Sequence, residues 1–280
     1  MSVLFTILGV VLVLALIYLF LVCPRMVGKP DRTPFMDVHY AHRGLFDNET
    51  AAPENSLAAI RKAIAAGYGI EFDVQLSKDD VPVVFHDASL KRMCGADGNV
   101  WEYTLEELQK LQLLNSNQTI PTLAEVLAVV DGQVPLIIEY KMDRVDTKVC
   151  QLGNELLKDY HGIYCMESFH PFAVKWYRKN RPDVLRGQLS QDFIRDGKKE
   201  FTMFLMTYLL TNFMTRPDFI AYCHRDAENI SRRVCRWLGA LSVTWTIKNQ
   251  EQYEKAKPHF DLFIFDSCIL KNNKKVRVDW

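Results

Sequence analysis

Two acidic residues, Glu71 and Asp73, are the clearest candidates for a functional site in this sequence. They belong to the run 70–76, which alternates apolar and polar residues and is typical of a half-buried strand. Because residues two apart on a strand point to the same face, the two carboxylates lie side by side there. Like charges this close repel each other unless a cation lies between them. A divalent metal ion with oxygen ligands is the simplest such cation, so the run predicts a metal site.

A hairpin should bring a histidine back to this acidic pair. The run 83–86 is rich in β-forming residues and ends in His86, and about six residues separate it from the first run. That connection is too short for a parallel crossover and suits an antiparallel hairpin. A turn near residues 78–80 would place His86 roughly level with Phe72. We therefore expect the acidic pair and the histidine to meet at one end of a strand.

The order of strand-like and helical runs along the chain indicates an α/β protein with one (β/α)8 TIM barrel. Strand-like and helical runs alternate over about 245 residues, which favours βα units, a parallel sheet and a single barrel. The eight parallel strands are expected at 38–42, 70–75, 135–140, 163–168, 185–189, 219–222, 241–246 and 262–266. The run 83–86 forms a hairpin after the second strand and lies outside this set.

A barrel of this kind carries its active site at the C-terminal ends of its strands. Five residues capable of chemistry fall at such ends, namely His42, Glu71, Asp73, Glu139 and Lys141. The three carboxylates make a suitable set of oxygen ligands for Mg²⁺ or Ca²⁺. Lys141 follows Glu139 by two residues, so it would form an ion pair with that carboxylate or face a phosphate group.

Three neighbouring residues have both a structural and a functional interpretation. Arg43 could present a bidentate guanidinium to phosphate oxygens, or it could form a surface salt bridge. Asn55 stands where a helix begins and could cap that helix. Glu54 could support the first turn of the same helix through the helix dipole.

The ordered motifs of the chain resemble the glycerophosphodiester phosphodiesterase family over about residues 37–266. The main motifs are His42-Arg43-Gly44, Pro53-Glu54-Asn55-Ser56, Glu71-Phe72-Asp73-Val74, Val83-Val84-Phe85-His86-Asp87 and Ile138-Glu139-Tyr140-Lys141. Further matches are Leu90-x-Arg92, Ser168-Phe169 and Thr244-Trp245-Thr246. The last strand departs from the family, because it reads Phe265-Asp266-Ser267-Cys268 where the family often has Thr-Asp-x-Pro.

The resemblance implies metal-dependent hydrolysis of glycerophosphodiesters to an alcohol and glycerol 3-phosphate. In that family His42 and His86 match the acid and base of catalysis. Trp245 matches a wall of the substrate cleft, although packing inside the barrel would also explain it. The sequence leaves open which histidine is the acid, and whether water or a neighbouring substrate hydroxyl attacks first. Lysophospholipids, cleaved in the manner of a phospholipase D, are the alternative substrates.

The N-terminal segment is predicted to be a single-pass transmembrane helix. Residues 3–22 are uncharged and mostly Leu, Val, Ile and Phe, and their helix would match a hydrocarbon core about 30 Å thick. No basic stretch precedes them and no small-residue cleavage site follows them, which disfavours a signal peptide. Arg25, Lys29 and Arg32 follow the span and place the catalytic domain in the cytoplasm by the positive-inside rule. The expected domains are a transmembrane helix (1–23), a linker (24–36) and the barrel (37–280).

The connection 190–217, between the fifth and sixth strands, is longer than a simple βα unit requires. Within it, residues 201–214 are predicted to form one helix that is apolar almost all round and too short to cross a bilayer. Basic residues flank this helix, as expected for contact with anionic headgroups. We expect a membrane-facing lid beside the active site, with burial against the barrel or in a dimer as the alternative.

Composition narrows the remaining classes of function. The 34 basic and 34 acidic side chains balance, so nothing in the charge suggests a nucleic-acid partner. The seven cysteines are odd in number and include no C-x-x-C pair, which argues against a disulfide framework and a cysteine zinc site.

Overall fold

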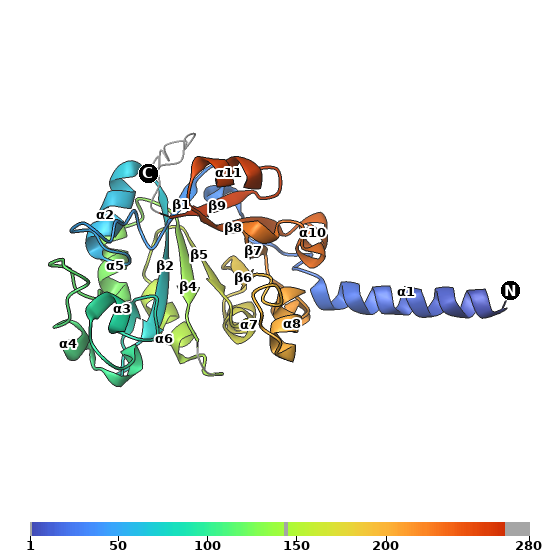
Figure 1. Cartoon of the computed structure of the whole chain (residues 1–280), viewed down its shortest axis with the longest axis horizontal. Coiled ribbons are helices and arrows are strands. Elements are labelled where there is room, and N and C mark those ends of the chain that lie inside the picture. Colours follow the sequence, from blue (N-terminus) through green and yellow to red (C-terminus); the bar gives the residue numbers. More distant parts are fainter. Residues whose placement is uncertain (1, 143–144, 267–280) are drawn as a thin grey trace.

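The structure, a computed structural model that describes residues 2–142 and 145–266, shows a closed parallel barrel (Figure 1). Its strands are β1 (His39–His42), β2 (Gly69–Leu76), β3 (Pro82–Val84), β4 (Leu136–Tyr140), β5 (Tyr164–Ser168), β6 (Arg186–Ser190), β7 (Phe219–Cys223), β8 (Leu241–Ile247) and β9 (Leu262–Phe265). Eight of them are parallel, and the pairing of β1 with β2 closes the ring. β3 pairs antiparallel with β2 as a hairpin. The predicted TIM barrel with a hairpin after its second strand is confirmed.

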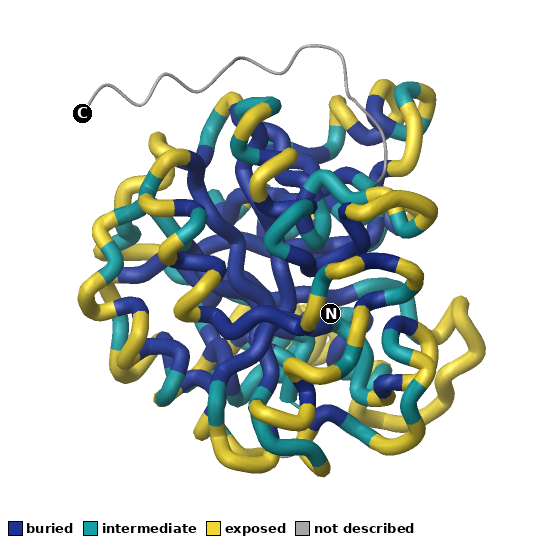
Figure 2. The backbone as a smooth tube through the Cα atoms, turned by 90° about the vertical axis from the view of Figure 1, so that its left-hand side faces the viewer, coloured by how far each residue is buried: buried dark blue, intermediate teal, exposed yellow. Residues whose placement is uncertain are grey.

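Helices surround the barrel, and buried residues fill its centre (Figure 2). The α-helices are α1 (Ser2–Val22), α2 (Leu57–Ala66), α3 (Lys91–Cys94), α4 (Leu105–Leu108), α5 (Leu123–Val130), α6 (Lys148–Leu157), α7 (Pro171–Asn180), α8 (Phe201–Thr207), α9 (Asn212–Thr215), α10 (Ile230–Trp237) and α11 (Gln250–Ala256). Short 3-10 turns add η1 (Thr33–Phe35), η2 (Val100–Glu102) and η3 (His224–Asp226).

Alternation along the strands sorts side chains between the barrel interior and the layer beneath the helices. On β4, Ile137 belongs to the interior cluster, whereas Ile138 packs in the cluster under the helices. On β2, Phe72 belongs to the outer cluster, so Glu71 and Asp73 point inward. The carboxylates therefore point into the barrel interior at the C-terminal ends of the strands, where barrel enzymes carry their active sites.

The β2–β3 hairpin has the predicted register. Val74 pairs with Val84, and the backbone N–H of Phe85 donates a hydrogen bond of 3.0 Å to the carbonyl oxygen of Asp73. The turn contains Asp80 in the left-handed region, with φ of 64°. His86 consequently follows the hairpin next to the inward-facing acidic pair.

The predicted single helix over 201–214 is wrong, because the structure breaks it into α8 and α9. Leu209, between the two helices, has a φ of 54°. The last carbonyls of α8 are taken by side chains of the barrel, since the Ser190 hydroxyl donates to Met206 O (2.7 Å) and the Tyr222 hydroxyl donates to Thr207 O (2.8 Å). These bonds satisfy the terminal carbonyls that helix continuation would otherwise use. α9 then packs against α7 and α1, as part of the outer helical layer.

The N-terminal helix α1 projects from one side of the barrel and is long and apolar enough to cross a membrane (Figure 1). The expected linker, 24–36, is attached to the barrel along its length. The backbone N–H of Arg25 donates to Pro217 O (3.0 Å), Lys29 Nζ donates to Gly239 O (2.7 Å), and Phe35 is buried. Of the expected barrel domain, residues 267–280, which include Ser267 and Cys268, lie outside the described part of the chain.

Candidate active site

Three carboxylates meet at the C-terminal end of the barrel interior. Glu71 and Asp73 come from β2, Glu139 comes from β4, and Asp73 and Glu139 are register partners. One oxygen of each carboxylate lies within 4.8 Å of the other two, and all three side chains are buried. The structure thus brings together the three residues predicted to bind a metal ion.

Burial and mutual repulsion oppose the ionisation of Glu71 and Glu139 in this cluster. Burial raises the pKa of Glu71 well above its usual value, and the neighbouring carboxylates of Asp73 and Glu139 raise it further. Burial also raises the pKa of Glu139 to about 7, although Lys141 acts in the opposite direction. Three hard oxygen ligands at this separation suit a divalent ion, which would favour their ionised forms.

Lys141 and Asn55 hold the carboxylate of Asp73 from two sides. Lys141 Nζ lies 2.9 Å from Asp73 Oδ1 and 2.6 Å from Glu139 Oε1, so the ion pair considered from the sequence exists. Asn55 Nδ2 donates to Asp73 Oδ2 at 2.9 Å. Burial alone would raise the pKa of Asp73, but Lys141 and the other nearby cations lower it well below its usual value. Asn55 is therefore no helix cap, and Ser56 takes that role by accepting from the N–H of Ala59.

The two predicted catalytic histidines line the same cavity as Glu71 and Glu139. His42 Nε2 lies 3.8 Å from Glu71 Oε2, and His86 Nδ1 lies 2.6 Å from Asp87 Oδ1. A carboxylate only accepts hydrogen bonds, so Asp87 favours the His86 tautomer that carries its proton on Nδ1 and leaves Nε2 free to react. Burial lowers the pKa of both histidines, and Arg43 lowers that of His42 further.

A buried acidic residue, Glu54, connects the two sides of the site. Arg43 Nη1 donates to Glu54 Oε1 at 2.7 Å, and Arg92 donates to both oxygens of Glu54 at 2.7 and 2.9 Å. Arg92 also binds Asp87 at 2.6 Å, so one chain of charged groups runs from Arg43 to His86. The sequence placed Glu54 and Arg92 in motifs, but their contacts could not be read from the spacing alone.

The cavity over the carboxylates has a volume of about 100 Å³ and mixed walls. Trp245, the predicted cleft residue, lines it and packs edge-to-face on Phe169, with ring centroids 5.4 Å apart. Glu167, at the end of β5, also lines the cavity and was not predicted. It is buried, Glu139 is its register partner, and its Oε2 has no hydrogen-bond partner among the described residues. Its position at a strand end, two residues before Phe169, could have marked it as a site residue from the sequence.

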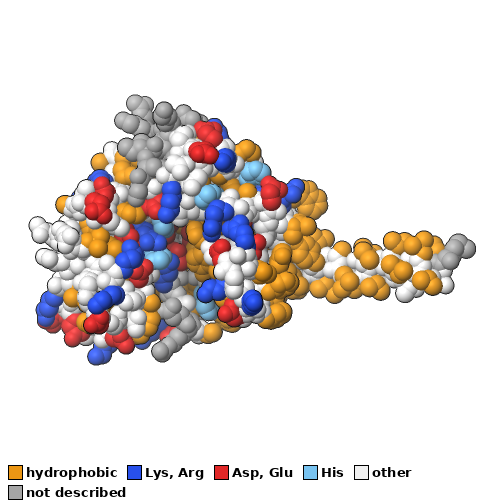
Figure 3. Space-filling model, viewed as in Figure 1, with side chains coloured by type: hydrophobic (Ala, Val, Ile, Leu, Met, Phe, Trp, Pro, Cys, Tyr) orange, Lys and Arg blue, Asp and Glu red, His pale blue; other side chains and the backbone are white. Residues whose placement is uncertain are grey.

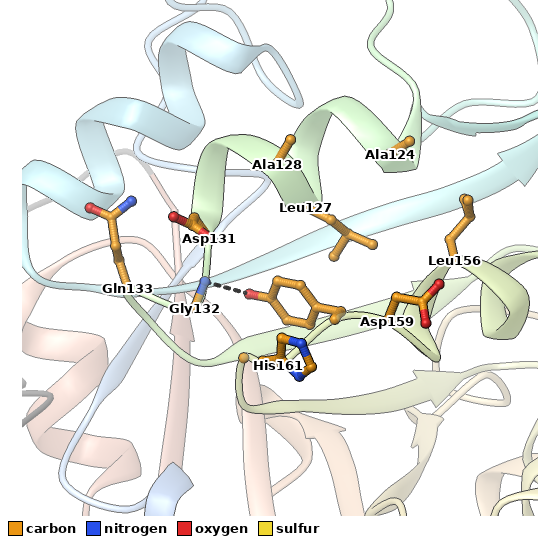
Figure 4. A pocket seen from close by; sticks show the side chains of 11 residues that line it. Ala124, Leu127, Ala128, Asp131, Gly132, Gln133, Leu156, Asp159 and His161 are labelled. Carbon is orange, nitrogen blue, oxygen red and sulfur yellow. Dashed lines mark hydrogen bonds between the residues drawn. The ribbon is translucent and has the colours of Figure 1, made fainter. Parts of the chain in front are cut away.

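A larger cavity of about 540 Å³ lies elsewhere, at the opposite end of the barrel (Figure 4). Its walls include Asp131 and Gln133, which precede β4, and His161, which precedes β5. None of the predicted site residues lines it. Because barrel chemistry is carried at the C-terminal ends of strands, the smaller cavity is the candidate active site.

Comparison with known proteins identifies the family of this chain. Residues 42–257 match the glycerophosphoryl diester phosphodiesterase family. A glycerophosphodiester phosphodiesterase of Caldanaerobacter subterraneus is 31% identical over 228 residues, which are 77% of this chain and 87% of that protein. Glycerophosphodiester phosphodiesterase 1 of Bos taurus is 39% identical over 270 residues, with 82% of this chain and 77% of that protein covered.

A solved structure shares the fold. A phosphodiesterase of Oleispira antarctica, in complex with the product sn-glycerol-3-phosphate, aligns with a TM-score of 0.68 at 25% identity, covering 83% of this chain and 94% of that chain. A shared fold and a family match over most of the chain therefore coincide. The chain belongs to the glycerophosphoryl diester phosphodiesterase family and is an enzyme that hydrolyses glycerophosphodiesters.

Proposed function

We propose that hydrolysis depends on a divalent metal ion, Mg²⁺ or Ca²⁺, held by Glu71, Asp73 and Glu139. The observation that carries this proposal is the buried convergence of the three carboxylates, within 4.8 Å of one another and with raised pKa values at two of them. When bound, the ion would supply positive charge against the phosphate group of the substrate. Arg43 and Lys141 add two fixed cations at the same end of the barrel, where phosphate oxygens would lie.

His42 and His86 act as the acid and base pair in this proposal. Both line the cavity, and burial keeps both neutral near pH 7 by lowering their pKa values. One neutral imidazole can take the proton of the attacking hydroxyl, and the other, after protonation, can give one to the leaving oxygen. Overall, water is added across one P–O bond, which yields glycerol 3-phosphate and an alcohol. Trp245 would form the wall on which the substrate packs.

Lysophospholipids are the second candidate substrates, favoured by a line of aromatic rings leading out of the cavity. Phe169 packs against Trp245, which lines the cavity with it, and against Phe193, with centroid distances of 5.4 and 6.1 Å. Phe193 lies in the connection that leads to α8, so an acyl chain could follow these rings. The cavity itself, at about 100 Å³, matches a small polar head rather than a whole lipid.

Product analysis separates these substrates and tests the acid–base roles. The full-length protein in detergent would be incubated with glycerophosphocholine and, separately, with lysophosphatidylcholine. The proposal predicts glycerol 3-phosphate and choline from the first substrate, with at least about 100-fold lower rates for His42→Asn and His86→Asn. Faster release of lysophosphatidic acid from the second would assign the enzyme to lysolipids. Full activity of either histidine variant would refute the acid–base assignment.

We also propose that α1 spans the membrane once and keeps the barrel in the cytoplasm. The support is the length and apolar surface of α1, followed by three basic residues within ten positions of its end, Arg25, Lys29 and Arg32. Protease added outside intact cells should leave the barrel undigested. Digestion of the barrel before lysis would place it on the other side.

A further inference from the structure

The last turn of α1 is built into the barrel domain. Val22 is fully buried, and its carbonyl oxygen accepts from Asn212 Nδ2 at 2.9 Å and from the Cys235 thiol at 3.2 Å. The Tyr18 hydroxyl lies 2.9 Å from the Ser231 hydroxyl. α9 and α10 thus flank the end of α1 from Tyr18 to Val22, which prevents the anchor from pivoting freely.

A basic side chain completes this attachment. Arg216 Nη1 donates to the carbonyl oxygens of Phe20 (3.0 Å) and Cys23 (2.7 Å), and its guanidinium carbon lies 5.0 Å from the centroid of the Phe20 ring. Phe20 also contacts Phe213 of α9, with ring centroids 6.1 Å apart. Two of the terminal carbonyls of α1, those of Phe20 and Val22, are therefore satisfied by side chains of the barrel domain.

This attachment shortens the part of α1 that can cross a bilayer unaccompanied. The free residues, 2–17, span about 24 Å at 1.5 Å per residue. The hydrocarbon core is about 30 Å thick. The remaining 6 Å or so corresponds to the last turn of α1, which α9 and α10 flank. Those two helices must therefore reach the boundary of the hydrocarbon core.

The surface around this turn is apolar, as that position requires. Exposed hydrophobic side chains form what we call the apolar collar: Phe201 and Phe204 on α8, Phe213 on α9, and Ile230 and Trp237 on α10. Trp237, Phe201 and Ile230 are 80%, 72% and 61% exposed. Figure 1 shows α8 and α10 on either side of the point where α1 leaves, and Figure 3 shows hydrophobic side chains gathered on that side of the body.

We propose that the apolar collar is a bilayer-binding surface that seats the barrel domain itself at the headgroup–acyl boundary. The collar continues the apolar surface of α1, and its most exposed member, Trp237, is of the residue type that favours membrane interfaces. The expected membrane contact of residues 201–214 is thereby reduced to Phe201, Phe204 and Phe213, because Met206 and Leu209 are buried in the barrel domain. The inference rests on α1 crossing the bilayer and does not depend on the substrate.

Quenching by brominated lipids tests the collar directly with native tryptophans. The full-length protein would be reconstituted in vesicles whose lipids carry bromine near the top of the acyl chain. Trp237→Phe should remove at least half of the quenchable fluorescence. Trp101→Phe is the matched control, because Trp101 lies in η2, in the hairpin region away from α1, and is also exposed. That variant should leave the quenching unchanged.

Three outcomes would overturn the proposal. Equal quenching in the wild type and both variants would mean that Trp237 does not reach lipid. If the full-length protein did not float with the vesicles, α1 would not span the bilayer, and the collar could not lie at its surface. Shielding of Trp237 without lipid quenching, together with cross-linking between two chains through residue 237, would assign the collar to a second copy of the protein.

Discussion

Without a metal ion, the stability of the barrel should fall as the pH rises from 5 to 8. Burial raises the pKa of the Glu139 carboxyl from 4.5 to about 7, so the folded protein binds this proton more tightly than the unfolded chain does. A raised folded-state pKa contributes stability that is complete below the unfolded value and is lost as the pH rises through the folded value. The relevant window therefore runs from about pH 4.5 to about pH 7.

The size of the effect follows from the pKa difference. A shift of about 2.5 units corresponds to about 3 kcal/mol, of which about 2.5 kcal/mol is lost between pH 5 and pH 8. For a domain of this length, 1 kcal/mol moves Tm by about 2–4 °C, so Tm should fall by about 5–10 °C. A divalent ion at about 100 times its Kd restores about 2.7 kcal/mol, because it binds the ionised carboxylates of the folded state.

Thermal unfolding of the full-length protein in detergent, followed by circular dichroism, measures this directly. Scans would be run from pH 5 to pH 8 with EDTA and again with Mg²⁺ or Ca²⁺. Glu139→Gln should lessen the pH dependence in EDTA by the amount that Glu139 contributes, whereas Glu155→Gln, an exposed carboxyl on α6, should leave it unchanged. Equal pH dependence in the wild type and Glu139→Gln, or a loss that the metal ions leave unchanged, would refute the electrostatic account of the cluster.

Three further substitutions test the surroundings of the site. Asp87→Asn should lower kcat about 10- to 100-fold and shift the limb of the pH–rate profile that His86 sets to lower pH. The reason is that the hydrogen bond which His86 donates to Asp87 raises the pKa of His86; steady-state rates from pH 5 to 9 check this. Asn55→Ala should weaken metal binding about 10- to 100-fold in titration calorimetry, since Asp73 loses the amide that orients it. Trp245→Ala should raise KM more than it lowers kcat, and an unchanged KM would leave Trp245 with packing alone.

The sequence was sufficient for the barrel and for the inward residues because both depend on local periodicity. A strand with alternating residues has a defined inner face, and the C-terminal ends of parallel strands meet at one end of a barrel. The sequence alone therefore predicted that Glu71, Asp73 and Glu139 lie together. In the structure, one carboxylate oxygen of each lies within 4.8 Å of the others. The short spacing before 83–86 likewise fixed the hairpin.

The contacts that depend on tertiary packing could not be predicted. Asn55 has the type and position of a helix cap, but Ser56 caps α2 and leaves Asn55 to bind Asp73. The segment 201–214 has the pattern of one apolar helix, yet side chains from β6 and β7 end α8 at Thr207. Hydrogen bonds between residues distant in sequence decided both outcomes, and no local pattern encodes them.

The proposed requirement for a divalent ion bound by the three carboxylates can be measured in one assay. Release of glycerol 3-phosphate from glycerophosphocholine would be followed for the full-length wild type and Asp73→Asn, each with EDTA and with increasing Mg²⁺ or Ca²⁺. EDTA should abolish release, the ion should restore it in the wild type, and Asp73→Asn should stay inactive at the same ion concentrations, as the requirement for the bound ion demands. Undiminished release in EDTA, or wild-type activity of Asp73→Asn, would contradict it.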